Sequence, residues 1–122
     1  MKITSFNPIY GTMNLNEAEE FFHALGFEVT HRFSQKDVEI RTLKNDAGLR
    51  IDILDSEYTR NAKVEGFFAT RMNVDDLQET VDFFTNNGAK LLSPIFNEGD
   101  SRKVVIIQTK NGDVYAVIHH IK

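Results

Sequence analysis

Residues 14–26 read NLNEAEEFFHALG, and residues 76–88 read DLQETVDFFTNNG. The two stretches share identical residues at a constant offset of 62 positions: Leu15, Glu17, Phe21, Phe22 and Gly26 recur as Leu77, Glu79, Phe83, Phe84 and Gly88. A unit that recurs in so short a chain predicts an internal duplication whose halves bury a face against each other. The junction of two such halves is also a common position for a small-molecule site.

The first repeated stretch has the signals of an amphipathic helix. Asn14 followed by Glu17 predicts an N-terminal cap resembling a capping box, and Gly26 predicts a left-handed stop. The apolar residues fall on one face at the 3.6-residue period: Leu15, Ala18, Phe21, Phe22 and Leu25. The second stretch predicts a helix over residues 76–87 with these inward residues: Leu77, Val81 and Phe84.

Strands are expected before and after each helix. In the first half the candidates are residues 3–12, 27–33, 37–43 and 49–54. In the second half they are residues 67–74, 89–92, 103–110 and 114–120. Pro8 indicates an edge strand or a bulge, Asn111-Gly112 predicts a hairpin turn, and residues 93–102 are expected to form a loop.

The order strand, helix and three strands occurs twice, which predicts an α+β fold built from two βαβββ modules. We expect a single domain over residues 1–122, with module 1 at residues 1–55 and module 2 at residues 66–122. The polar residues 56–65 are expected to connect the modules.

The bulk composition excludes several classes of protein. The chain has 14 Lys+Arg and 18 Asp+Glu, a net charge of -4, which argues against nucleic acid or an anionic membrane as the main partner. It has no cysteine, so disulfides, thiolate catalysis and thiolate metal sites are excluded. The longest apolar run, residues 114–118, is far shorter than the roughly 20 residues of a membrane span. No apolar leader is visible at the amino terminus, and we expect a cytoplasmic location.

Three motifs together resemble the vicinal-oxygen-chelate superfamily, also called the glyoxalase/bleomycin-resistance/dioxygenase group. They are Asn14-Leu-(x)5-Phe-Phe-(x)2-Leu-Gly-Phe27, Asp75-Asp-Leu-(x)5-Phe-Phe84 and Asn111-Gly-Asp113. The resemblance covers essentially the whole chain and implies two modules that form a partly open mixed β-barrel around a cleft. It says little about activity, because this scaffold carries lyases, isomerases, dioxygenases and drug-binding proteins.

The resemblance also implies where metal ligands would lie. Metal-dependent members take one ligand from the first and the last strand of each module. The corresponding residues here are Asn7 and Asp52 in the first module and Ala69 and Ala116 in the second. Alanine donates nothing to a metal, and His119 and His120 point to opposite faces of a strand, so they cannot together replace the missing pair. We therefore expect no metal and no other cofactor.

Strand alternation places several polar and apolar side chains toward the same cleft. The expected ligand-binding residues are Asn7, Arg50, Asp52, Phe67, Arg71, Ile118 and His120, and Phe96 is a further candidate for contact. For Phe67 and Ile118 the alternative is a filled hydrophobic core. For Arg71 the alternatives are an anion-binding group and a solvated surface side chain.

Asp52 is the best candidate for a catalytic residue. Its carboxylate is able to hydrogen-bond a ligand, attract a cationic one or act as a general base. Arg50 follows the same strand face two residues earlier, so a structural ion pair of Asp52 with Arg50 or Arg71 is an equal alternative.

By resemblance to the antibiotic-sequestering branch, we expect a metal-independent protein that binds a small organic molecule between its modules, and binding is favoured over catalysis. The same resemblance implies a homodimer. The alternative is a glyoxalase I-like lyase, an isomerase or a dioxygenase whose Zn, Ni or Fe ion is bound by Asp52 and His120.

Overall fold

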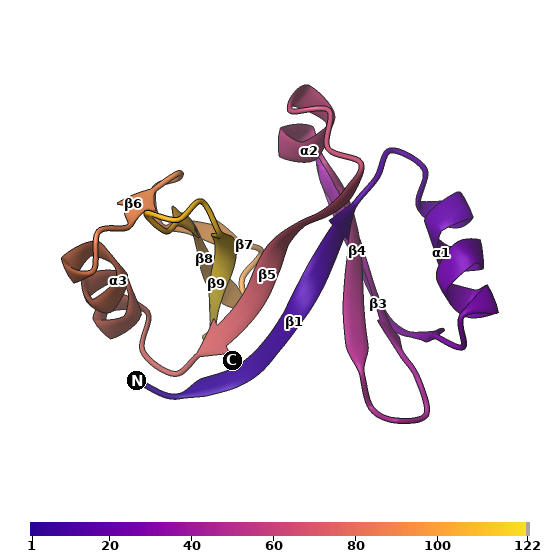
Figure 1. Cartoon of the computed structure of the whole chain (residues 1–122), viewed down its shortest axis with the longest axis horizontal. Helices are drawn as coiled ribbons and strands as arrows, with labels where there is room; N and C mark the ends of the chain where they lie inside the picture. Colours follow the sequence, from indigo (N-terminus) through magenta and orange to yellow (C-terminus); the bar gives the residue numbers. More distant parts are fainter. Residues whose placement is uncertain (122) are drawn as a thin grey trace. The chain divides into compact units, whose positions relative to one another are not determined.

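A computed structural model describes residues 1–121 of the chain. In chain order its elements are β1 (Ile3–Gly11), α1 (Leu15–Ala24), β2 (Glu28–Gln35), β3 (Val38–Lys44), β4 (Arg50–Ser56), α2 (Glu57–Asn61), β5 (Gly66–Val74), α3 (Leu77–Asn86), β6 (Lys90–Leu91), β7 (Phe96–Glu98), β8 (Arg102–Gln108) and β9 (Val114–His120) (Figure 1). The predicted α+β class is confirmed. Within residues 1–121, no helix has the length and apolar character needed to cross a membrane.

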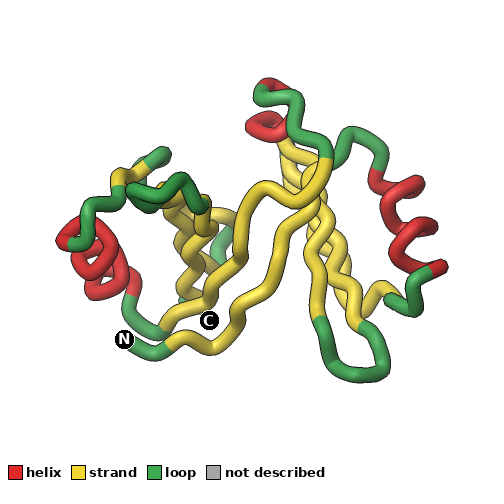
Figure 2. Tube along the Cα trace, in the orientation of Figure 1, coloured by secondary structure: helices red, strands yellow, loops and turns green. Residues whose placement is uncertain are grey.

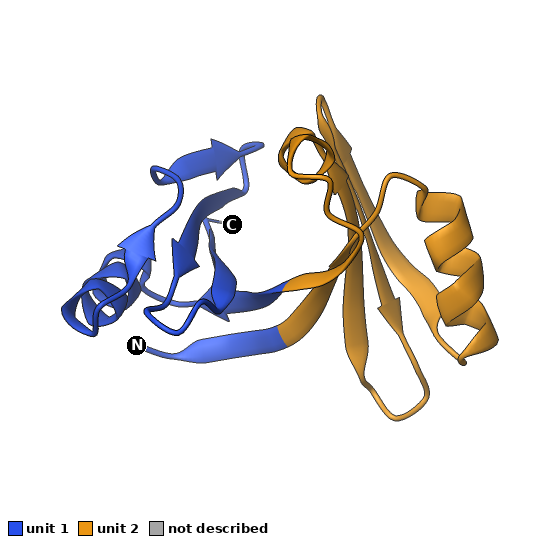
Figure 3. Ribbon diagram, turned by 45° about the horizontal axis from the view of Figure 1, so that its top comes forward, with its two compact units in different colours: residues 1–6, 69–122 blue, residues 7–68 orange. Residues whose placement is uncertain are grey.

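The chain divides into two compact units (Figure 3). Unit 1 contains residues 1–6 and 69–122, and unit 2 contains residues 7–68. These boundaries differ from those of the sequence repeat, because β1 and β5 each contribute residues to both units. Phe6 of β1 contacts Tyr115 of unit 1, with ring centroids 6.0 Å apart. Phe67 of β5 contacts Tyr10 of unit 2 at 5.1 Å.

Unit 2 is a mixed sheet in the order β2-β3-β4-β1, with helix α1 on one face (Figures 1 and 2). Strand β3 is antiparallel to β2 and β4, whereas β1 is parallel to β4. The buried core between α1 and the sheet consists of Leu15, Ala18, Phe22, Leu43, Ile51 and Ile53. Because side chains alternate along a strand, the neighbours of Ile51 and Ile53 point to the opposite face.

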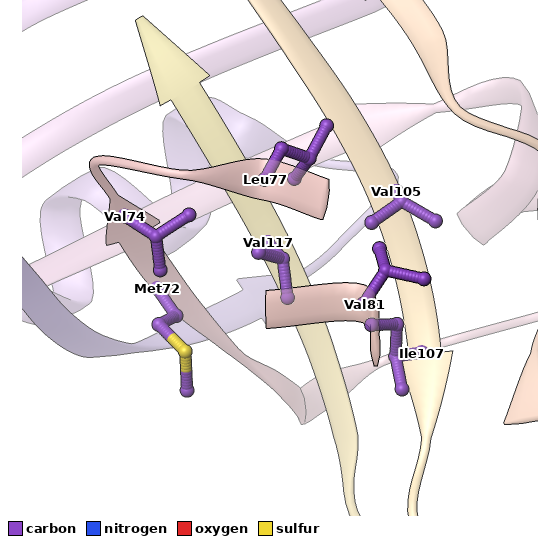
Figure 4. Packing of buried hydrophobic residues seen from close by; sticks show 7 residues of the cluster. All are labelled: Met72, Val74, Leu77, Val81, Val105, Ile107 and Val117. Atoms are coloured by element: carbon purple, nitrogen blue, oxygen red, sulfur yellow. The ribbon is translucent and has the colours of Figure 1, made fainter. Parts of the chain in front are cut away.

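Unit 1 has the sheet order β5-β9-β8, and both β6 and β7 pair with β8 (Figure 2). Strand β9 is parallel to β5 and antiparallel to β8. Figure 4 shows the core, with two side chains from α3 and five from strands: Leu77, Val81, Met72, Val74, Val105, Ile107 and Val117. Tyr115 is partly buried and packs against this cluster.

The two repeated stretches form helices with matching ends. The Asn14 side chain accepts from the Glu17 N–H at 3.1 Å, and the Asp76 side chain accepts from the Glu79 N–H at 2.9 Å. These bonds satisfy backbone donors that a helix start leaves unpaired. Gly26 follows the first helix with φ 102°, a left-handed conformation that glycine adopts without strain.

The apolar face predicted for the first helix is too wide. Leu15, Ala18 and Phe22 are buried, but Phe21 and Leu25 are each 59% exposed. Helix α1 ends at Ala24, so Leu25 lies beyond its last turn. The ring of Phe21 packs edge-on against Phe22 at 5.3 Å and remains at the border of the core.

Two elements were missed in segments that the sequence marks as polar. Residues 56–65 contain helix α2, which begins where Ser56 accepts from the Thr59 N–H at 3.2 Å and the Thr59 side chain reciprocates. The expected loop at residues 93–102 contains β7, a three-residue strand paired with β8. Pro8 is accommodated within β1, whose ladder to β4 begins at Ile9.

A charged network ties α1 to the sheet of unit 2. Glu19 accepts from Arg41 at 2.7 Å and from both terminal nitrogens of Arg32 at 3.4 Å. Desolvation is the largest single influence on Glu19 and raises its pKa, but the hydrogen bonds and charges of the two arginines outweigh it. The pKa of Glu19 is therefore lowered from its ordinary value.

Candidate functional site

A buried polar cluster lies on the face of unit 2 that points away from α1. The strand register places Asp52 of β4 beside Ile9 of β1 and Thr42 of β3. Asp52 is only 2% exposed, and Asn7 and Thr42 are also buried. A buried carboxylate is costly unless it is paired and hydrogen-bonded. The surrounding donors explain how Asp52 is tolerated.

Both oxygens of Asp52 accept hydrogen bonds. Asn7 Nδ2 donates to Oδ2 at 2.8 Å, and Thr42 Oγ1 donates to Oδ1 at 2.7 Å. Arg50 Nη2 lies 3.3 Å from the same Oδ1 and makes an ion pair with it. The ion pair of Asp52 with Arg50, one of the alternatives from the sequence, is thus present in the structure.

The contacts of Asn7 fix the orientation of its amide. Nδ2 faces two acceptors, Asp52 Oδ2 and the carbonyl oxygen of Pro8 at 3.1 Å. The amide oxygen Oδ1 is buried and has no hydrogen-bond partner within residues 1–121. Nε of Arg50 is likewise buried without a hydrogen-bond partner in this described part of the chain. Unit 2 therefore contains one buried acceptor and one buried donor without a hydrogen-bond partner, in side chains that bond Asp52.

This donor set does not fit a divalent metal ion. Asp52 already accepts from an amide, a hydroxyl and a guanidinium group, and the cationic Arg50 opposes a second positive charge nearby. The corresponding positions of unit 1, Ala69 and Ala116, have no donor atom in their side chains. Within residues 1–121, no three side chains of His, Cys, Asp or Glu form a group able to hold a metal.

Unit 1 has a line of three polar side chains on the face of its sheet opposite α3: Arg71, Asn73 and His120. Arg71 Nε donates to Asn73 Oδ1 at 3.1 Å, and Asn73 Nδ2 lies 3.3 Å from His120 Nε2. A guanidinium nitrogen only donates, so the amide oxygen faces Arg71 and the amide nitrogen faces His120. Nε2 of His120 is then the acceptor and carries no proton. Arg71 is 6% exposed, so the alternative of a solvated surface side chain is wrong.

The other expected residues of unit 1 share this face. Ala116 pairs with Arg71 across β9 and β5, and Ile118 pairs with Asn73. Ile118 is buried beside Val104 of β8. His119 points the other way, with Nδ1 3.2 Å from the carbonyl oxygen of Val74, as strand alternation predicts. Phe96 lies on the short strand β7.

The placement of Phe67 differs from the prediction. Its ring contacts Tyr10 and Phe22, which pack on the α1 side of the unit 2 sheet, and 58% of the residue is exposed. Strand alternation predicts Phe67 and Arg71 on one face, because both lie on β5 an even number of residues apart. Since β5 contributes to two units, one alternation pattern does not define one face along its whole length.

Sequence reasoning missed two members of these networks. Thr42 was overlooked because its position beside Asp52 depends on the register of the β3–β4 hairpin. Asn73 follows Arg71 by two residues on the same strand, so the alternation that selected Arg71 also pointed to it.

Comparison with known proteins identifies the fold family. A sequence profile of the Glyoxalase/Bleomycin resistance protein/Dioxygenase superfamily matches residues 6–114, which is most of the chain. The chain belongs to this superfamily. No curated protein matches the sequence.

Several solved structures share this superfamily fold at low sequence identity. Methylmalonyl-CoA epimerase from Mycobacterium tuberculosis is 15% identical with a TM-score of 0.74, covering 96% of this chain and 88% of that chain. Streptomyces coelicolor methylmalonyl-CoA epimerase in complex with 2-nitronate-propionyl-CoA is 16% identical with a TM-score of 0.73, covering 99% and 100%. A hypothetical protein from Bacillus halodurans C-125 is 12% identical with a TM-score of 0.76, covering 98% and 97%.

Proposed function

We propose that this member of the superfamily binds a small organic molecule without a metal ion, using the face of unit 2 formed by Asn7, Arg50 and Asp52. The observation that carries the proposal is the pair of buried, unused polar atoms on that face, Asn7 Oδ1 and Arg50 Nε. Buried polar groups in native proteins nearly always have a partner, and the exceptions call for a ligand, an ion or a water molecule. For unit 1, taken by itself, we propose that Arg71, Ile118 and His120 form a second ligand-binding face.

The hydrogen bonds that Asp52 accepts favour a binding role over catalysis. A general base needs a carboxylate oxygen within reach of the proton that it removes. Both oxygens of Asp52 are already occupied by donors from the protein, and one of these donors is cationic. Asp52 is therefore better suited to hold Asn7 and Arg50 in place than to accept a proton from a substrate.

An isomerase is the second candidate, and the likeness of the fold to two methylmalonyl-CoA epimerases favours it. Such an activity on this chain would require a proton acceptor and a group that stabilises the developing negative charge of an enolate. Within unit 1, Arg71 is a suitable cation for that charge, and His120 Nε2 would have to release its hydrogen bond from Asn73 before it could accept a proton.

Measurements of ligand binding and of metal binding distinguish the two candidate functions. We expect some small molecules to raise the melting temperature of the protein, because a ligand that binds only the native state stabilises it. The rise is expected to be smaller in Arg50→Lys and unchanged in Arg60→Lys, since Arg60 bonds Asp55 away from the cluster.

Titration with Zn, Ni and Fe by calorimetry is expected to show no stoichiometric binding. One-to-one metal binding that Asp52→Ala abolishes would contradict the proposal and support a metal-dependent enzyme. Exchange of the α-proton of an acyl thioester into deuterated water, without added metal, would support the isomerase instead.

A cytoplasmic homodimer is part of the proposal through the family resemblance, and sedimentation analysis tests the dimer.

A further inference from the structure

The chain contains two Asn-Gly dipeptides, Asn87-Gly88 and Asn111-Gly112. The first ends helix α3, and the second lies in the turn between β8 and β9 (Figure 1). All four residues are exposed to solvent. An asparagine loses its side-chain amide most readily when glycine follows it, because glycine has no side chain that hinders attack by its own backbone nitrogen. Sequence and exposure do not distinguish the two sites, so their local hydrogen bonds decide which one reacts.

The reaction needs water and no other reagent. The glycine nitrogen gives its proton to solvent and attacks Cγ of the asparagine, so that a bond from this nitrogen to Cγ forms, the bond from Cγ to Nδ2 breaks and ammonia leaves. Water then opens the cyclic succinimide at either carbonyl carbon. The products are aspartate and isoaspartate, and in isoaspartate the main chain passes through the side-chain methylene. The glycine nitrogen must therefore lose its hydrogen bond and approach Cγ.

At Asn87 both reacting groups are held at the end of α3. The Asn87 side chain donates through Nδ2 to the carbonyl oxygen of Phe83 at 2.8 Å, and the Gly88 N–H donates to the carbonyl oxygen of Thr85 at 3.2 Å. The ψ angle of Asn87 is 24°, which turns the Gly88 nitrogen away from the Asn87 side chain. The chain must break both bonds and unwind the helix end before the ring can form.

At Asn111 a single hydrogen bond holds the reacting atoms. The Gly112 N–H donates to the carbonyl oxygen of Thr109 at 2.9 Å, and within residues 1–121 no hydrogen bond engages the Asn111 side chain. The base of the turn is closed separately, because the Thr109 N–H donates to the Asp113 carbonyl oxygen at 2.9 Å and the Asp113 N–H donates to Thr109 Oγ1 at 3.1 Å. The tip can thus open while the strands stay paired, and exposed loop tips open at low free-energy cost.

We propose that Asn111 is a covalent modification site, at which the folded protein loses the side-chain amide through a succinimide with Gly112 and does so faster than at Asn87. Each hydrogen bond that local opening must break lowers the population of the reactive form. The side-chain bond of Asn87 is therefore expected to slow that site by about three- to tenfold relative to Asn111. The inference is independent of the proposed ligand binding.

The isoaspartate product would alter the turn and leave the middle of the β8–β9 hairpin intact. It adds a methylene group to the main chain, which disturbs the bond from Gly112 to Thr109 and the adjacent strand pair of Gln108 with Val114. Val117 lies further along the hairpin and is fully buried. Amide hydrogen exchange in the modified protein is expected to be faster at Gly112 and unchanged at Val117.

The experiment follows the unaltered protein over time in mildly alkaline buffer made with ¹⁸O-labelled water. Samples are acidified and digested, and peptide mass spectrometry with fragmentation measures the conversion of each asparagine and the incorporation of solvent oxygen. We expect conversion at Asn111 to exceed that at Asn87 by at least about three- to tenfold. In urea, where the chain is unfolded, the two sites are expected to react at similar rates because glycine follows both.

Two variants provide matched controls. Asn111→Gln should abolish the conversion at position 111 and leave the rate at Asn87 unchanged, because glutamine would have to close a larger and more slowly formed ring. Asn87→Gln should leave the conversion of Asn111 unchanged, and circular dichroism shows that each variant folds. If Asn87 reacts as fast as Asn111 in the folded protein, or if Asn111 reacts only in urea, the inference is wrong. A preference for Asn111 that is equally large in urea would also contradict it, since the fold would then not be the cause.

Discussion

Asn7 and Asp52 are 45 residues apart in sequence, and Asn7 Nδ2 donates to Asp52 Oδ2 over 2.8 Å in the interior of unit 2. The bond joins β1 to the neighbouring strand β4 at a point where the chain buries a full negative charge. Removal of Asp52 would leave every donor around the carboxylate without this acceptor.

Replacement of Asp52 by alanine is expected to destabilise the protein by about 2–4 kcal/mol. The variant leaves Asn7 Nδ2, Thr42 Oγ1 and the Arg50 guanidinium group without their shared acceptor. Urea denaturation followed by circular dichroism measures the change. Asp55→Ala is the control, because Asp55 lies on the same strand but bonds the exposed Arg60. Equal stability of the two variants would show that the buried network contributes nothing.

The histidines at the end of β9 are expected to have the same tautomer when neutral. The carbonyl oxygen of Val74 can only accept, so Nδ1 of His119 carries the proton. The amide nitrogen of Asn73 donates to His120 Nε2, so the proton of His120 is on Nδ1 as well. The ¹⁵N chemical shifts of both rings at high pH test this assignment. In Asn73→Leu the His120 spectrum is expected to change and that of His119 to remain, whereas a protonated His120 Nε2 in the unaltered protein would contradict the bonding scheme.

Glu19 is expected to make stability depend on pH in the acid range. Desolvation opposes its ionisation, but Arg32 and Arg41 lower the pKa of the folded state below the ordinary value of 4.5. A lowered folded-state pKa stabilises the protein above the unfolded-state pKa, and this contribution is lost as the pH falls through the folded-state value.

Glu19→Gln should therefore be less stable than the unaltered protein at neutral pH, by no more than about 1 kcal/mol because the side chain is partly exposed. The difference should vanish at a pH below the folded-state pKa of Glu19. Thermal melts across the acid range provide the measurement, and Glu20→Gln, on the exposed side of the same helix, is the control. A difference that persists unchanged at low pH would mean that the glutamate acts through packing alone.

Gly11 is expected to resist even the smallest substitution. A Cβ atom at this position would lie 2.7 Å from Val64 Cγ1 and 3.2 Å from two ring carbons of Phe68. Valine is stiff about χ1 and does not move aside easily, so Gly11→Ala should cost about 1–3 kcal/mol. The double variant Gly11→Ala/Val64→Ala should recover part of this loss relative to the sum of the single variants, as a double-mutant cycle measures. Simple additivity would show that the contact is not the cause.

Much of this structure could be predicted from local sequence signals. The cap at Asn14, the turn at Gly112 and the alternation that places Asp52 opposite the core depend on neighbours within a few residues. Helix α2 was missed because its short, polar sequence has no apolar period, and its Ser56 cap was not recognised as a start signal.

The site was harder to predict than the fold because its geometry depends on strand register. The partner of Asp52 at Thr42 is set by the β3–β4 hairpin, and the separate placement of Phe67 and Arg71 is set by the division of β5. The orientation of the Asn7 and Asn73 amides depends on three-dimensional neighbours that no spacing along the chain specifies.

The division of β1 and β5 has a consequence for the independence of the repeats. A fragment cut at the end of the first repeat, before residue 66, would lack Phe67, whose ring closes over Tyr10 and Phe22. A fragment containing only the second repeat would lack Phe6, whose ring covers Tyr115. Each repeat thus contributes one aromatic ring to the packing of the other, and a fragment cut at the boundary between the repeats is expected to lose that packing.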